Sequence, residues 1–168
     1  MDNSILSELK WSAGGGAMMH KETMPFKFFA PIKVRFNETD LQGHVNFGQY
    51  LFYFDVGATE YHAAIGYDYD RMWAEGIDLL YAEAHCNYKS PVKWPEALNV
   101  HTRLAHLGRR SLRYEFDIRA ETDGRQVATG HIVAITAERG TWAEREIPEG
   151  LRRAVAEYEG GEQNTAGS

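Results

Sequence analysis

An acidic residue, a glycine and a histidine lie in one short segment, directly before the longest helical pattern in the sequence. Asp40, Gly43 and His44 are followed by Asn46, a residue type that often caps helices. The first turn of a helix presents unpaired backbone N–H groups and a partial positive charge. These groups can stabilise a developing oxyanion, and a carboxylate beside them can act as nucleophile or general base. The segment therefore predicts an oxyanion-stabilising site, unless Asp40 and Asn46 are ordinary turn and cap residues.

Basic and acidic side chains elsewhere form a second group of candidates. Lys89, Arg109 and Arg110 stand at strand ends near predicted hairpins and could pair with phosphate groups, although exposed basic residues at turns usually bind nothing. Asp55 and Glu60 lie on the long helix outside its apolar face, which is typical of solvated or interface acids. Three polar residues share outward strand faces and either line a cleft at a dimer seam or are structural: His85, Asn87 and His101.

The composition excludes several classes of protein. The chain has 168 residues, enough for one domain with some length left for tails. A net charge of −6 argues against a general nucleic-acid binder, and the apolar stretches are far shorter than the roughly 20 residues of a membrane span. Cys86 is the only cysteine, so an intrachain disulfide and a Cys-based zinc site are excluded. Because no secretory signal or cofactor motif is visible, we expect a cytoplasmic protein without metal or cofactor.

The long helix that follows the acidic segment is predicted from its apolar period. Seven apolar residues recur on one face of a 3.6-residue helix. Asn46 is the expected N-cap, Gln49 completes a variant of the capping box, and Gly66 is the expected C-terminal stop. The seven residues are Phe47, Tyr50, Leu51, Phe54, Ala58, Tyr61 and Ile65.

Strand patterns surround this helix in the sequence. One precedes it, at residues 32–36, and four follow it, at residues 80–88, 98–104, 112–120 and 127–137. In the first of these four, alternate residues from Leu80 to Tyr88 are expected on one face, and the last is apolar on both faces, as an interior strand would be. Gly108 and Asp123-Gly124 supply hairpin turns, and Pro148 opens a short helix.

These elements predict an α+β fold in which an antiparallel sheet of about five strands wraps around one long helix. We expect a flexible N-terminal arm at residues 1–24, the domain at 25–145, and a short helix with a disordered tail at 146–168. Pairing two such units edge to edge would protect an edge strand, so a homodimer or homotetramer is expected.

Five segments in the same order resemble the hotdog-fold acyl-CoA thioesterases of the 4-hydroxybenzoyl-CoA thioesterase type. The resemblance extends from about Lys27 to Glu138, which is nearly the whole predicted domain. Several linked segments are far more specific than a single motif. The matching segments are residues 35–50, 52–54, 59–61, 88–92 and 107–112.

The resemblance implies an acyl-CoA thioesterase in which Asp40 is the catalytic carboxylate. It also implies that a backbone N–H at Phe47 or Gly48 polarises the thioester carbonyl, with Asn46 and Tyr50 beside the substrate. Lys89, Arg109 and Arg110 would then bind CoA. His44 departs from members that carry an aliphatic residue there, and it either orients water or packs under the loop. A second hotdog lineage places its acid on the helix, which makes Glu60 the reserve candidate.

Three alternatives remain open at the level of sequence. The substrate could be carried by an acyl carrier protein instead of CoA. A hotdog dehydratase pairs a histidine with an acid, and His44 stands near Asp40. The chain could also be an acyl-CoA-binding protein that does not turn its ligand over, although a retained Asp40 argues against this.

Overall fold

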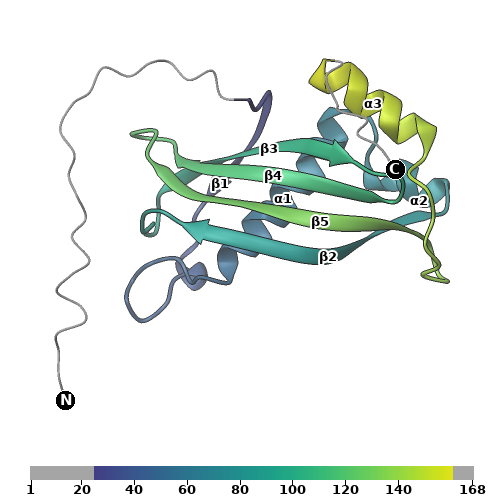
Figure 1. Ribbon diagram of the computed structural model, residues 1–168. Helices are drawn as coiled ribbons and strands as arrows, with labels where there is room; N and C mark the ends of the chain where they lie inside the picture. The colour runs from purple at the N-terminus through teal and green to yellow at the C-terminus, as the bar shows by residue number, and fades with distance from the viewer. Residues whose placement is uncertain (1–24, 161–168) are drawn as a thin grey trace.

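The computed structural model describes residues 25–160, and the proposed arm at 1–24 and the tail at 161–168 lie outside the described residues. Five strands, three α-helices and one 3-10 turn make up this part of the chain (Figure 1). The strands are β1 Phe28–Lys33, β2 Ile77–Tyr88, β3 Ala97–Leu107, β4 Ser111–Ala120 and β5 Gln126–Glu138. The helices are α1 Gln49–Ala64, α2 Tyr69–Ala74 and α3 Glu149–Glu159, and the 3-10 turn η2 is Phe36–Glu38.

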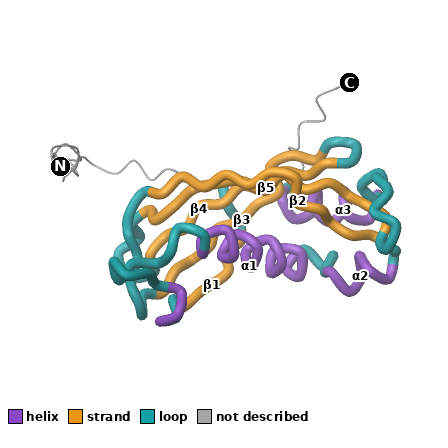
Figure 2. The backbone as a smooth tube through the Cα atoms, turned by 90° about the horizontal axis from the view of Figure 1, so that it is seen from below, coloured by secondary structure: helices purple, strands orange, loops and turns teal. Residues whose placement is uncertain are grey.

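The five strands form one antiparallel sheet in the order β1-β3-β4-β5-β2. Figure 2 shows α1 lying along one face of this sheet, so the predicted architecture is confirmed. Strand β5 lies between β4 and β2, in agreement with its apolar character on both faces. Strands β1 and β2 are the two edges, and β2 therefore carries an unpaired side in the protomer.

Helix α1 begins two residues later than the sequence predicts. Its N-cap is Gly48, and Asn46 instead accepts a hydrogen bond from the Gly48 N–H through its side-chain oxygen (2.9 Å). The predicted capping box is absent because Gln49 is the first residue of the helix, and its side-chain amide donates to Glu38 (3.5 Å). As a result Phe47 precedes the helix and is 72% exposed, and Leu51 is 40% exposed, so the prediction that both face the core is wrong. The C-terminal prediction is correct, since Gly66 follows the helix with φ +70°.

Strand β2 contains an irregularity that the alternating sequence pattern conceals. The pairing with β5 shifts register between Tyr81 and Glu83, which is a β-bulge at this point of the strand. A bulge reverses the alternation of the side chains, so Leu79 instead of Leu80 packs against the core. The sequence prediction therefore holds for the C-terminal half of the strand, where Cys86 packs against the core, and fails for its N-terminal half.

The contact between α1 and the sheet is close enough to require glycine at one position. A Cβ added to Gly57 would lie 2.6 Å from the Thr102 hydroxyl and 2.8 Å from a methyl group of Val100. One turn earlier, the Phe54 ring stacks on Phe116 with centroids 4.4 Å apart. These two contacts fix the height and rotation of α1 above β3 and β4.

We expect Gly57→Ala to lower the free energy of unfolding by about 1–3 kcal/mol, because the added methyl group overlaps two side chains of the sheet. The sign is informative, since Ala in a helix interior is otherwise about 1 kcal/mol more favourable than Gly. Urea denaturation of both proteins measures the difference. Thr59→Ala on the exposed side of α1 is the control and should raise stability slightly. A stabilised Gly57→Ala protein would contradict the close packing.

His62 is a completely buried polar side chain near the C-terminal end of α1. Its Nδ1 lies 3.1 Å from the Tyr67 carbonyl oxygen, which can only accept, so Nδ1 carries the proton. Its Nε2 then accepts from the Tyr114 hydroxyl at 2.6 Å. Burial lowers the pKa of His62 from 6.5 to about 4, so the imidazole is neutral in the folded protein.

This histidine should make stability depend on pH. Below pH 6.5 the unfolded chain takes up a proton at His62, whereas the folded protein does so only near pH 4. Stability is therefore full above pH 6.5 and falls as the pH drops towards 4, by about 3 kcal/mol in total. We expect His62→Gln to lose this component when unfolding free energies are compared from pH 4 to 7. Parallel pH profiles for the two proteins would contradict it.

Candidate functional site

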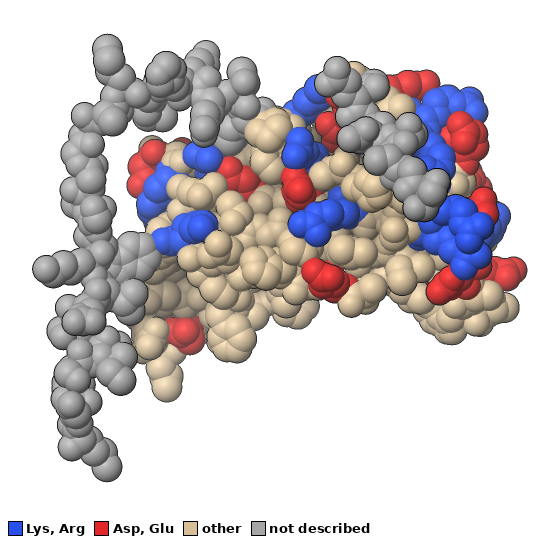
Figure 3. Space-filling model, viewed as in Figure 1, with Lys and Arg blue, Asp and Glu red and all other residues tan. Residues whose placement is uncertain are grey.

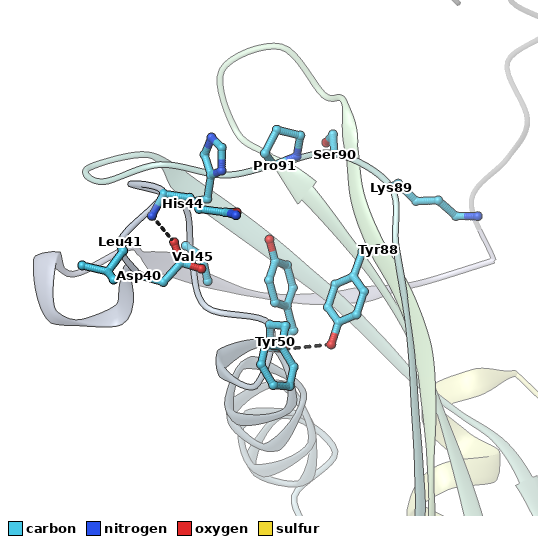
Figure 4. Close-up of a pocket in the computed structure, with 11 residues that line it drawn as sticks. Asp40, Leu41, His44, Val45, Tyr50, Tyr88, Lys89, Ser90 and Pro91 are labelled. Carbon is cyan, nitrogen blue, oxygen red and sulfur yellow. Dashed lines mark hydrogen bonds between the residues drawn. The ribbon is translucent and has the colours of Figure 1, made fainter. Parts of the chain in front are cut away.

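A hollow of about 820 Å³ lies where the N-terminus of α1 meets the C-terminal end of β2 (Figure 4). Its walls come from two segments far apart in the sequence and from the first turn of the helix. The loop before α1 contributes residues 40–42, 44, 45 and 47, the helix contributes Tyr50, and the end of β2 contributes residues 88–91. The predicted residues Asp40, His44, Phe47, Tyr50 and Lys89 thus border one space.

The loop holds Asp40 through a tight turn. The Asp40 N–H donates to the His44 carbonyl and the Gly43 N–H donates to the Asp40 carbonyl, both at 2.9 Å. Gly43 has φ +74°, a conformation that favours glycine. One carboxylate oxygen of Asp40 accepts from the Gln42 N–H at 2.8 Å. The other accepts no hydrogen bond from any residue between 25 and 160, and it remains available to a water molecule or a substrate.

Two hydrogen bonds orient the peptide that precedes α1. The Tyr88 hydroxyl donates to the Phe47 carbonyl at 2.9 Å, and the Gly48 N–H donates to Asn46, as described above. Of the two amides proposed as oxyanion donors, that of Gly48 is therefore occupied. The Phe47 N–H has no partner within the described part of the chain. Tyr88 belongs to the matching segment 88–92, but no role in the site was predicted for it, because only the fold shows that the end of β2 meets this peptide.

A second hollow of about 360 Å³ lies between α1 and β2. Gly48 is part of its lining, so this hollow adjoins the start of the helix. Its only charged group is Asp55, whose carboxylate accepts a hydrogen bond from the Tyr81 hydroxyl at 2.7 Å. Asp55 is therefore part of a polar pair with β2. The remaining lining is apolar and consists of Leu51, Phe52, Ala84 and Ile132.

The structure separates the remaining candidates from the first hollow. Arg109 and Arg110 lie in the β3–β4 turn, at the opposite end of the sheet from Lys89, and pair with Glu146 and Glu144. Figure 3 shows basic and acidic side chains gathered at that end. Glu60 is exposed on α1.

The three polar residues predicted on outward strand faces also lie apart from the first hollow's lining. The His85 ring stacks on His131 at 5.3 Å, and the His101 ring lies 5.4 Å from Phe29. Asn87 is exposed on β2 opposite Thr129. None of these contacts involves the loop that carries Asp40.

Among residues 25–160, no cluster of three or more His, Cys, Asp or Glu side chains could hold a metal ion. No helix in the same range is both long enough and apolar enough to cross a membrane.

Comparison with known proteins identifies the family to which the chain is similar. The sequence model of the thioesterase-like superfamily matches residues 34–155. A protein of Aquifex aeolicus (strain VF5), named "Putative esterase", is 30% identical over 123 residues, which are 68% of this chain and 94% of the relative.

Solved structures agree with the family match. The DHNA-CoA thioesterase from Staphylococcus aureus is 25% identical with a TM-score of 0.73, and the match covers 78% of this chain and 89% of that one. A gentisyl-coenzyme A thioesterase is 24% identical with a TM-score of 0.70, over 77% of this chain and 100% of the other. The hotdog fold that the sequence resemblance implied is thereby confirmed.

Proposed function

Because the chain belongs to the thioesterase-like superfamily, we propose that it hydrolyses the thioester bond of an acyl-CoA with Asp40 as its catalytic carboxylate. The observation that carries the proposal is the shared hollow, which Asp40, Phe47 just before α1, and Tyr50 in the first turn of α1 all border. The name of the similar Staphylococcus aureus protein, a DHNA-CoA thioesterase, supports CoA as the carrier of the acyl group.

In the proposed reaction the thioester carbonyl oxygen accepts a hydrogen bond from the Phe47 N–H, which has no partner among residues 25–160. The helix dipole favours the negative charge that develops on this oxygen. Asp40 then attacks the carbonyl carbon, or it removes a proton from a water molecule that attacks. The carbon–sulfur bond breaks and CoA leaves as a thiolate, a leaving group that needs no strong general acid. Transfer of label from water into Asp40 in a single turnover would identify direct attack.

The second hollow is the proposed place for the acyl group. It adjoins the helix start, so an acyl chain whose carbonyl lies at Phe47 can extend along α1 into it. Apolar side chains form most of its lining, and the Asp55–Tyr81 pair supplies one polar point. An apolar or aromatic acyl group fits this lining.

A dimer through the β2 edges would complete the CoA site. In such a dimer the two β2 strands pair antiparallel about a two-fold axis, so the partner's sheet runs in the opposite direction. The partner's β3–β4 turn then lies at the same end as the C-terminal end of this protomer's β2, near the first hollow. Lys89 of one subunit and the partner's Arg109 and Arg110 could then share the CoA phosphates. Exposed apolar side chains beside this edge, such as Phe52 and Tyr81, favour the same pairing.

Asp40→Asn should lower kcat on acyl-CoA by about 10²–10⁴-fold, because the amide can neither attack nor accept a proton. Release of free thiol from aromatic, short-chain and long-chain acyl-CoAs measures the effect. Glu60→Gln is the matched comparison, since it neutralises the reserve acid, which lies on α1. Loss of activity in Glu60→Gln with full activity in Asp40→Asn would reject the assignment.

Sharing of the CoA site between subunits can be tested with mixed dimers. An Asp40→Asn subunit and an Arg109→Ala/Arg110→Ala subunit each lack one half of the site. When they are combined, the shared arrangement restores one intact site in each mixed dimer. For the isolated mixed dimer we therefore expect about half of the wild-type kcat with a normal KM, whereas each homodimer is defective. If all groups came from one subunit, mixing would restore nothing.

A further inference from the structure

Tyr50 carries a hydroxyl group that has no partner in the described part of the chain. Its ring is only 4% exposed. Each of the other buried tyrosines uses its hydroxyl within the protein: Tyr53 bonds Glu38, Tyr61 bonds Glu159, Tyr67 bonds Glu75 and Tyr114 bonds His62. The Tyr50 hydroxyl makes no hydrogen bond to residues 25–160. The Tyr50 ring is buried but its hydroxyl is not fully enclosed, so the hydroxyl is open to a ligand in the first hollow, which Tyr50 borders.

The hydroxyl is also held in one place. The Tyr50 ring packs edge-on against Tyr88 at 5.1 Å and against Tyr53 at 6.0 Å. Figure 4 shows the side chain entering the hollow between Asp40 on one side and Tyr88 on the other. Because Tyr50 belongs to the first turn of α1, its side chain leans towards the same helix start that presents the Phe47 N–H.

Burial raises the pKa of Tyr50 to about 12, so the hydroxyl keeps its proton throughout the physiological range. This is well above the value of a free alkyl thiol, about 8.5 for cysteine. A phenol of this kind can stabilise a thiolate by donating a hydrogen bond without giving up the proton.

We propose that the Tyr50 hydroxyl donates a hydrogen bond to the thioester sulfur and stabilises the departing thiolate. The inference rests on the proposed thioesterase function and deepens it. In the proposed reaction the Phe47 amide binds the carbonyl oxygen and Asp40 lies beside the carbonyl carbon. Tyr50 lies between Asp40 on one side and Tyr88 and Lys89 on the other (Figure 4). Because the CoA phosphates are proposed to lie at Lys89, the sulfur, which joins CoA to the carbonyl carbon, lies on the side of the carbonyl that faces Tyr50.

The reaction balances without any proton from Tyr50. In the water route, a bond forms between the water oxygen and the carbonyl carbon as Asp40 takes one proton. The carbon–sulfur bond then breaks, and its electron pair stays on the sulfur, to which the Tyr50 O–H remains hydrogen-bonded. Asp40 returns its proton to solvent or to the thiolate as the products leave.

The test is Tyr50→Phe, which keeps the buried ring and removes only the hydroxyl. With benzoyl-CoA we expect kcat to fall about 10- to 100-fold with KM nearly unchanged, the loss of one hydrogen bond to a charged group. With the benzoyl thioester of 4-nitrothiophenol, whose thiolate needs little stabilisation, the defect should shrink to about threefold or less. The kcat of wild type is divided by the kcat of the variant for each substrate separately. The loss of binding contacts to CoA in the 4-nitrothiophenol ester affects both proteins and therefore cancels in this ratio.

Two controls separate the possible failures. Tyr158→Phe, at the end of α3, should match wild type on both substrates. Asp40→Asn should be defective on both, and a wild-type protein that releases no thiol from any acyl-CoA would refute the proposed function itself. An active wild type with a Tyr50→Phe defect that is equal for the two leaving groups, or absent, would overturn the role of Tyr50 alone.

Discussion

The packing of α1 against the sheet is the constraint on which the site depends. The helix is fixed along its length by the stacking of Phe54 on Phe116, by the close approach at Gly57, and by the His62–Tyr114 hydrogen bond. A helix held in this way has a defined N-terminus, and its first turn stays at the sheet end where β2 finishes. Helix-dipole and amide effects act only over the first turn, so their usefulness depends on this placement.

A second requirement is that the loop before α1 keeps its shape in contact with water. Glu38 supplies much of this order. Its carboxylate accepts from the Arg35 N–H and the Tyr53 hydroxyl, both at 2.8 Å, and its carbonyl accepts from the Asn46 N–H at 2.9 Å. These bonds connect η2, α1 and the returning end of the loop. Asp40 thus occupies a turn whose two ends are anchored, although the residue itself is exposed.

The sequence was sufficient for the fold because the periodic patterns are strong and the packing agrees with them. It was insufficient where two local solutions compete. Asn46 and Gly48 are both acceptable N-caps, and the tertiary contact between Gln49 and Glu38 accompanies the later start. The bulge in β2 leaves no mark on an alternating pattern. Within the site, Asp40 and its neighbours could be predicted from one segment, whereas Tyr88 and the Asp55–Tyr81 pair depend on contacts between distant elements.

The polar groups that the fold leaves unpaired help to locate the chemistry. Over residues 25–160, the Phe47 N–H, one oxygen of Asp40 and the Tyr50 hydroxyl have no partner within the protein, and all three residues border the first hollow. Asp40 and Phe47 are exposed, so these groups are open to water or to a ligand. The buried side-chain atoms without partners in this range are guanidinium nitrogens of Arg110 and Arg125, and both side chains form ion pairs. Two donors, the Phe47 N–H and the Tyr50 hydroxyl, and one acceptor, the Asp40 oxygen, thus face one space. A thioester and a water molecule can together bond to all three groups, whereas a loop with a structural role alone would not need to keep them free.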